Sequence, residues 1–265
     1  MVALRPHPNH PHHQAHHHHD PAYDVRSLPM SRPFIWLASA WEDMLHHRLA
    51  SLAYGAIVCA MGAIILAYQR HPLFLAAAVS CFFLVGPILA AGLCDLSRRS
   101  DANLRSDFDS SLDALGRNRV QLARVGLYML AISIGWFAAS YLVIQNTIGP
   151  VAPAYEATVW GDVLRHLSSE QLMAYALSLS LLSAVIFSLS VVTVPMIIHR
   201  HVDANTAIIT SLKVTMKDFP MMLVWSALIL AMVTIGFASY LIALLVIFPL
   251  LGHATWYAYR DLVKD

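Results

Sequence analysis

The chain has 265 residues, of which 58% are hydrophobic and only 12% are charged, with a formal net charge of +1. Because soluble domains carry about a quarter charged residues, this composition indicates a membrane protein. At about 20–25 residues per span, the length allows five or six helices with short connections and leaves no room for a separate soluble catalytic domain. The nearly neutral charge gives no reason to expect nucleic acid as a partner.

Residues 1–32 form a His- and Pro-rich tail. Such a composition cannot bury a core, so we expect disorder, and no apolar run that could act as a cleavable signal precedes Phe34. Neutral imidazoles bind Zn, Cu and Ni, so the tail is a candidate for loose metal binding. Its histidines are His7, His10, His12, His13, His16, His17, His18 and His19.

Residues 33–48 are predicted to form an amphipathic helix in the headgroup region, with Trp36 and Trp41 at the depth that tryptophan prefers. Glu42 and Asp43 lie on the polar face of this helix. The apolar face is expected to hold Ile35, Leu37, Trp41, Met44 and Leu45. The alternative is a frayed start of the first span.

Five stretches contain no Lys, Arg, Asp or Glu, namely 49–69, 71–94, 125–155, 171–199 and 219–259. A helix needs about 20 apolar residues to cross about 30 Å of hydrocarbon, so each stretch predicts at least one span. The last stretch is twice as long as one span requires, and we expect two helices joined by a turn near 236–239. The predicted fold is therefore an all-α bundle of six transmembrane helices, at about 49–69, 72–94, 125–145, 172–195, 220–236 and 239–259.

The distribution of positive charge favours six spans over five. With six spans and both termini in the cytoplasm, 15 of the 17 Lys and Arg residues lie inside, and only Arg70 and Arg165 lie outside. With five spans the division weakens to 13 against 4.

Short amphipathic helices are predicted in the connections. Leu104, Phe108, Leu112 and Leu115 recur at helical spacing before Gly116. A second helix is expected to begin at the N-cap Asp203, with Ile209, Leu212, Met216 and Phe219 as its apolar stripe. A third is expected around residues 160–167. Each lies on the bilayer or plugs the bundle, or else presents a docking face to a partner.

Two prolines lie at matching positions in their spans. Pro87 precedes Arg98, and Pro249 precedes Arg260, by eleven residues each. A proline frees a backbone carbonyl, which neighbouring helices or a watery cavity must satisfy. The pattern therefore indicates either kinked helices packed through small residues or a cavity that opens to the cytoplasm.

His253 is the histidine that lies well inside an apolar span, where a polar side chain either packs through hydrogen bonds or marks a pathway. Trp256 and Arg260 resemble an interfacial belt with a snorkelling cation. If a cavity exists, its candidate binding residues are Pro87, Arg98, Arg99, Pro249, His253, Trp256 and Arg260. A haem would need a second histidine at matching depth, so no haem is expected.

The three cysteines, Cys59, Cys81 and Cys94, lie within spans without metal or redox spacing, so no disulfide is expected. We find no phosphate-binding loop, nucleophile elbow, zinc-protease motif or paired carboxylates within the spans. The sequence therefore predicts no enzymatic activity and no cofactor.

From Ser51 onward the chain resembles a family of bacterial integral membrane proteins that is catalogued as domain of unknown function 2189. The resemblance rests on SLAYG (51–55), VGPILAAGL (85–93), SRR (97–99), VPMIIHRHVDANTAIITS (194–211), WSALI (225–229) and FPLLGHATWYAYRDLV (248–263). Cys94 and His199 depart from the family pattern, which implies a tyrosine and an acidic residue there. The resemblance implies a bacterial inner-membrane location and brings no established activity; some members carry a cytochrome oxidase label, which the scarcity of span histidines here does not support.

Three functions are compatible with these features. The leading hypothesis is a non-catalytic accessory or scaffold protein, whose partners are the lipid bilayer and another membrane protein. The second is a permease or channel for a small anionic solute. The third is metal handling through the tail.

Overall fold

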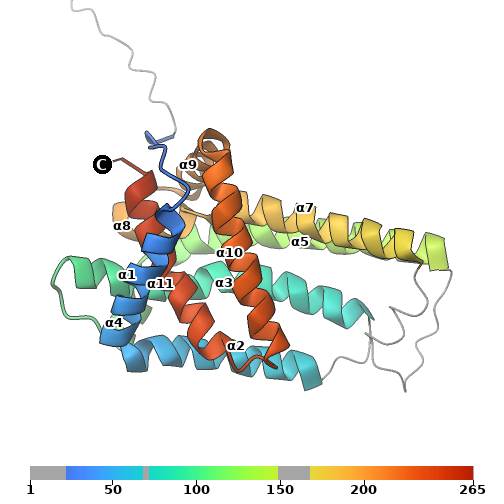
Figure 1. The fold of residues 1–265 in the computed structure, drawn as a ribbon, viewed down its shortest axis with the longest axis horizontal. Coiled ribbons are helices and arrows are strands. Elements are labelled where there is room, and N and C mark those ends of the chain that lie inside the picture. Colours follow the sequence, from blue (N-terminus) through green and yellow to red (C-terminus); the bar gives the residue numbers. More distant parts are fainter. Residues whose placement is uncertain (1–21, 68–71, 149–167, 265) are drawn as a thin grey trace, which may run out of the picture.

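The computed structural model describes residues 22–67, 72–148 and 168–264, and the regular elements in these ranges are α-helices (Figure 1). This confirms the all-α class. The helices are α1 (Arg32–His46), α2 (Arg48–Ala67), α3 (Pro72–Asp101), α4 (Phe108–Arg117), α5 (Arg119–Ile148), α7 (Ser169–Ser190), α8 (Thr193–Arg200), α9 (Ala204–Lys217), α10 (Phe219–Ala238) and α11 (Leu244–Leu262).

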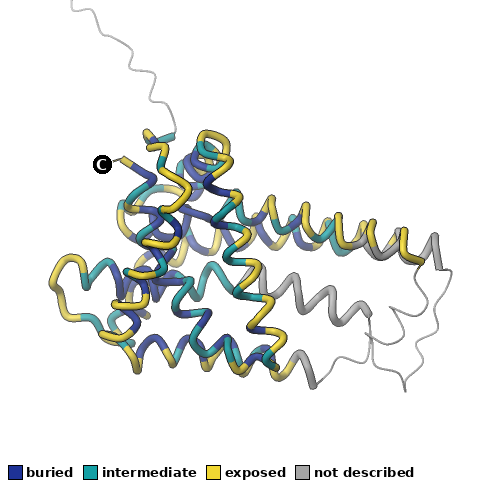
Figure 2. Tube along the Cα trace, viewed as in Figure 1, coloured by how far each residue is buried: buried dark blue, intermediate teal, exposed yellow. Residues whose placement is uncertain are grey.

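Two sets of helices run in different directions. Figure 1 shows α2, α3, α5 and α7 extended along the long axis, whereas α1, α10 and α11 run across that axis at one end. The contacts of α11 are most extensive with α1, α2 and α3. Figure 2 shows buried residues concentrated at this end, where the rings of Trp36 and Trp225 meet edge to face at 5.6 Å.

Three helical segments among the described residues are long and apolar enough to cross a bilayer: Arg119–Ala139, Ala176–Arg200 and Phe219–Ala238. A fourth is obtained if α1 and the start of α2, bent by 106° where they join, count as one span. By length and composition, the described helices therefore do not show the six predicted spans. Helix α11 does not qualify as a span, because polar and charged side chains occupy its second half from His253 to Asp261.

The long uncharged stretch 219–259 is divided into two helices, as predicted, but the turn lies a few residues later than expected. Helix α10 continues to Ala238, and the turn includes Tyr240 and Leu241, which both have positive φ. Gly236 lies within α10, where a Cβ would come within 2.3 Å of the Leu244 side chain. This glycine therefore permits close helix packing and does not make the turn.

Residues 22–31, which the composition predicts to be disordered, are ordered in the structure. Val25 is buried and forms an antiparallel bridge with Val263. Leu28 N–H donates to Asp218 at 2.7 Å, and the Lys217 ammonium donates to the Val25 carbonyl at 2.8 Å. Composition alone could not show this order, because its hydrogen-bond partners lie about 190 residues away along the chain.

The face of α1 that packs inward is only partly the predicted one: Met44 is buried and Leu37 packs against the core, as expected. Trp36, Ala40 and Asp43 are buried, whereas Ile35 and Trp41 are about half exposed. Trp36 therefore belongs to the core and not to a headgroup belt. The reason is that α11 supplies a hydrogen-bond acceptor for its indole, as described below.

The predicted N-cap of α9 is confirmed, since the Asp203 carboxylate accepts from the Thr206 amide and hydroxyl, which lower its pKa. The apolar stripe of this helix faces outward, since Ile209, Leu212 and Met216 are exposed. Phe219, which was predicted to continue the stripe, is also exposed but begins α10. Helix α4 begins at Phe108, later than the periodicity suggests, because Asp107 and Ser110 form a capping box. The predicted helix at 160–167 lies outside the described residues.

The predicted span 172–195 is interrupted, because α7 ends at Ser190 and α8 begins at Thr193. Pro195 follows directly, and its missing N–H cannot bond to the carbonyl of Val191. The proline therefore accounts for the interruption.

We expect Gly55→Ala to lower the free energy of unfolding by about 1–3 kcal/mol. A Cβ at Gly55 would lie 2.2 Å from the backbone oxygen of Leu245, so α2 and α11 would have to separate. Thermal unfolding in detergent micelles measures the effect. Gly86→Ala is the matched control, because no atom lies within 4 Å of its Cβ position; an equal loss of stability in both variants would contradict the prediction.

Candidate functional site

The second half of α11 carries the polar side chains that connect the bundle, and we call this set the α11 network. Its members on α11 are His253, Trp256, Tyr257, Tyr259, Arg260 and Asp261. Their partners lie on α1, α2, α3 and α8. Since residues three and four apart share a helix face, one helix can present several polar groups to several neighbours.

His253 is fully buried and is bonded on both sides of its ring. Ser51 Oγ of α2 lies 2.9 Å from Nε2, and Ser97 Oγ of α3 lies 2.7 Å from Nδ1. This satisfies the ring and fixes its orientation between the two helices. The arrangement matches the packing interpretation of His253.

Two carboxylates accept hydrogen bonds from α11. The Tyr257 hydroxyl donates to buried Asp43 of α1 at 2.9 Å. Asp101, at the end of α3, accepts from the Trp256 indole at 2.6 Å and also pairs with Arg260. Trp256 is therefore buried and anchored, and is not part of an exposed interfacial belt.

Asp261 is a hydrogen-bond acceptor on α11, whereas the contacts of this helix with Asp43 and Asp101 described above use donors on α11. It accepts from the Trp36 indole and from Arg32 Nε of α1, each at 2.8 Å. On another side of the helix, Arg200 Nε donates to the Tyr259 hydroxyl at 2.9 Å, and His199 Nδ1 lies 2.9 Å from the same oxygen. The network thus reaches from α1 to α8.

Arg98 and Arg99 are paired within their own helix. Asp95 has no exposed side-chain area and lies 2.6 Å from Arg98 and 2.7 Å from Arg99. These pairs have i,i+3 and i,i+4 spacing, at which helical side chains meet. The two arginines therefore neutralise a buried carboxylate, which differs from the free anion-attracting role that the sequence suggested.

Pro87 lies in α3 and Pro249 lies in α11, and these two helices pack against each other. Pro249 is buried and Pro87 is partly buried. Close packing surrounds Pro249, because a Cβ on Gly252 would lie 2.4 Å from the Leu93 side chain. Buried Cys94 adds a contact, with its thiol directed at the Gly252 carbonyl at 3.5 Å. Among the described residues, neither proline nor His253 lines either of two surface hollows, at the C-terminal end of α11 and beside α9.

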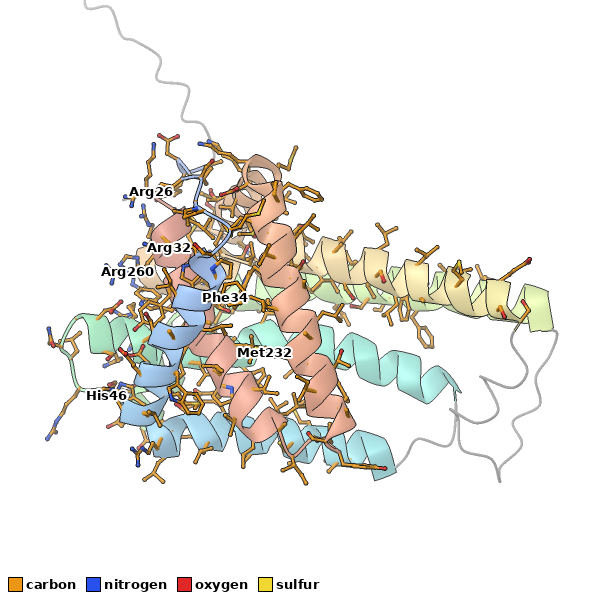
Figure 3. All side chains as sticks on the ribbon, in the orientation of Figure 1. Arg26, Arg32, Phe34, His46, Met232 and Arg260 are labelled. Carbon is orange, nitrogen blue, oxygen red and sulfur yellow. The ribbon has the colours of Figure 1, made fainter. Side chains whose placement is uncertain are left out.

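One of those hollows is a groove of about 340 Å³ at the C-terminal end of α11, which we call the basic groove. Figure 3 shows Arg26, Arg32 and Arg260 gathered at this end of the molecule. The groove is lined by Arg26, His199, Arg200, Tyr257, Tyr259, Arg260, Asp261 and Val263. Only Arg260 among these was a candidate from the sequence.

The metal candidates His7 to His19 lie outside the described residues. Within residues 22–67, 72–148 and 168–264, no three His, Cys, Asp or Glu side chains are grouped as a metal site. Burial lowers the pKa of His47, at the junction of α1 and α2, and favours its neutral form.

Sequence reasoning missed the carboxylates Asp43, Asp95, Asp101 and Asp261. The pairing of Asp95 could have been found from its i+3 and i+4 arginines. No sequence signal indicates that Asp101 meets Trp256, since 155 residues separate them.

The apolar helices and the partnered polar interior define an integral membrane protein of helical type, and comparison with known families supports this. Residues 74–199 match the model of the family described as "Predicted integral membrane protein (DUF2189)", so this segment of the chain is similar to that family. The resemblance seen in the sequence is thus confirmed, and contact with a lipid bilayer follows. Neither curated proteins nor solved structures gave a match.

We expect Ser97→Ala to cost about 1–3 kcal/mol of stability, because it removes a partner from a buried imidazole nitrogen. In a His253→Ala background the same substitution should cost at least about 0.5 kcal/mol less, since the two residues act as a pair. Unfolding in micelles measures both. The control is Ser180→Ala, whose exposed hydroxyl donates to the Ala176 carbonyl within its own helix. Additive effects of Ser97→Ala and His253→Ala would contradict the pairing.

Proposed function

We propose that the chain is a six-span protein of the bacterial inner membrane, with both termini in the cytoplasm, that acts without catalysis as an accessory or scaffold protein. The observation that carries the proposal is the α11 network. Its polar groups are bonded to groups on neighbouring helices and hold the bundle together, which is a structural role.

The placement of the two chain ends supports an even number of crossings. Arg26 N–H donates to the Leu262 carbonyl at 2.8 Å, and Lys264 N–H donates to the Asp24 carbonyl at 3.0 Å. Since these segments flank the membrane domain, their pairing requires them to lie on one side of the bilayer. The positive-inside rule then favours the cytoplasm.

The exposed apolar face of α10 supports a scaffold role. In the apolar stretch of α10 that is long enough to cross a bilayer, only 22% of the residues are buried. The corresponding share is 28% in α5 and 56% in the segment that joins α7 and α8. Leu223, Leu230 and Ile235 are each more than half exposed on it. Lipid tails can cover such a face, and a second membrane helix can also pack against it. We infer that the partner docks on α10.

The permease alternative receives less support, because Pro249 and His253 are packed in the interior and Arg98 and Arg99 are paired with Asp95. Metal handling remains a separate proposal for the tail. Deleting residues 1–20 would lower Zn, Cu or Ni retention if the tail binds these ions, and unchanged retention would exclude this role.

Topology reporters should place fusions at residue 22 and after residue 264 in the cytoplasm, and a fusion after Tyr240 in the periplasm. The reason is that the proposed six crossings would end with α10 and α11, which would return the chain to its starting side. Paired phosphatase and fluorescent-protein fusions measure this. A C-terminal fusion found across the bilayer from the N-terminal one would contradict the proposal.

Affinity capture in mild detergent should recover one membrane protein in a reproducible ratio, and Ala231→Trp on α10 should reduce its recovery severalfold by obstructing the docking face. Ala184→Trp on α7 is the matched control, since both alanines are exposed in apolar helices. Equal recovery with both variants would locate the partner elsewhere and contradict docking on α10.

In proteoliposomes the wild-type protein should give the same small-anion flux as empty vesicles. Flux above that of empty vesicles that His253→Ala or Arg260→Ala abolishes would instead establish the permease function and overturn the scaffold proposal.

A further inference from the structure

The outward face of α5 changes from charged to apolar along the helix. Residues three and four apart share a helix face. The exposed residues on this face are Val120, Arg124, Leu127, Ala131, Ile134 and Ala138. Leu127 and Ile134 are each more than half exposed, within a segment that is long and apolar enough to cross a bilayer. Such a face contacts lipid, so Arg124, one turn earlier on the same face, lies where the hydrocarbon meets the headgroups.

Packing on the opposite side fixes the orientation of the first turns of α5. The Gln121 side-chain oxygen accepts from the Ala204 amide of α9 at 3.1 Å, and Val125 is buried in the core. Arg119 and Arg124 lie on the other sides of these turns, where both are exposed. The two arginines are therefore held at the outer surface by the inward contacts of their own helix.

The charges of Arg119 and Arg124 are not neutralised within the protein. In the part of the chain that the structure describes, neither guanidinium forms an ion pair or a hydrogen bond. Residues 114–155 contain no Asp or Glu. Asp203, which precedes the Ala204 contact in sequence, already accepts two hydrogen bonds within α9. The donors of both guanidinium groups are therefore available to an anion outside the chain.

We propose that Arg119 and Arg124 bind the phosphate group of an anionic phospholipid in the leaflet where α5 begins. A guanidinium presents N–H donors in a planar fork that matches phosphate oxygens, and such charge-assisted bonds are about twice as strong as neutral ones. Arg119 also lies in the first turn of α5, which carries no acidic residue. The helix dipole disfavours a positive charge there and favours an anion, so a bound phosphate stabilises this end of the helix.

The apolar continuation of the same face identifies the source of the phosphate as a lipid. From Leu127 onward the face is apolar, so it accommodates acyl chains while the headgroup reaches Arg124. Arg117 is left out of the site, because it follows Asp113 by four residues, a spacing at which the two side chains can pair. This lipid site goes beyond the scaffold role and requires only that α5 crosses the bilayer.

Native mass spectrometry of the purified full-length chain measures binding of dioleoyl phosphatidylglycerol and, separately, of dioleoyl phosphatidylcholine. We expect tighter binding of phosphatidylglycerol, because its headgroup has a net negative charge and that of phosphatidylcholine has none. Arg119→Ala and Arg124→Ala should each weaken phosphatidylglycerol binding about fivefold, as expected for one cation at a lipid surface. Arg124→Lys, which keeps the charge without the fork, should fall between the wild type and Arg124→Ala.

Arg105→Ala is the matched control, because Arg105 is an exposed arginine in the loop before α4 and lies on no membrane-crossing helix. The Arg119 variant tests the site even if Arg124→Ala fails to fold. The proposal is overturned if phosphatidylglycerol binds no more tightly than phosphatidylcholine, or if Arg105→Ala weakens binding as much as the site variants. Displacement of the lipid by inorganic phosphate at constant ionic strength would also overturn it, since the site would then recognise free phosphate. Because the assay needs no partner protein, its failure leaves the scaffold proposal standing.

Discussion

Burial of the polar half of α11 is the constraint on which the arrangement of the other helices depends. A buried polar group without a partner costs several kcal/mol in an apolar medium, and a buried charge costs more. His253, Trp256 and Tyr257 are therefore stable in the interior only where serines and aspartates of other helices meet them. This requirement fixes α1, α2 and α3 around α11, and it explains why α1 turns its tryptophan and aspartate inward.

Several helices carry exposed large apolar side chains, although the core also contains large apolar side chains. Helix α9 buries Ala204, Ala207 and Thr210 and exposes its apolar stripe. Water would penalise this pattern, whereas lipid does not. In lipid the helices gain stability from close approach, which Gly55 and Gly252 allow by leaving room for a neighbour's backbone or side chain. The network and the glycines thus act together, since close approach brings the polar partners within hydrogen-bond distance.

These features separate the interior from the surfaces at which function is expected. The polar residues of the α11 network are bonded to partners on neighbouring helices, which argues for a structural role for most candidates that the sequence offers. The outward face of α10 is the surface on which the proposed scaffold role depends.

The sequence by itself determined the membrane environment, the helical class, the two-helix character of 219–259 and the N-cap at Asp203. These depend on local signals, namely apolar length, helical spacing and a carboxylate three residues before a free amide. The sequence did not determine the roles of the side chains in the candidate site. Arg98 and Arg99 carry the same charge whether they attract an anion or neutralise Asp95, and Trp36 has the same amphipathic ring at a headgroup or beside Asp261. Only the tertiary structure decided these roles, because the groups that satisfy each polar atom come from helices that are remote in the chain and meet only after the bundle has formed.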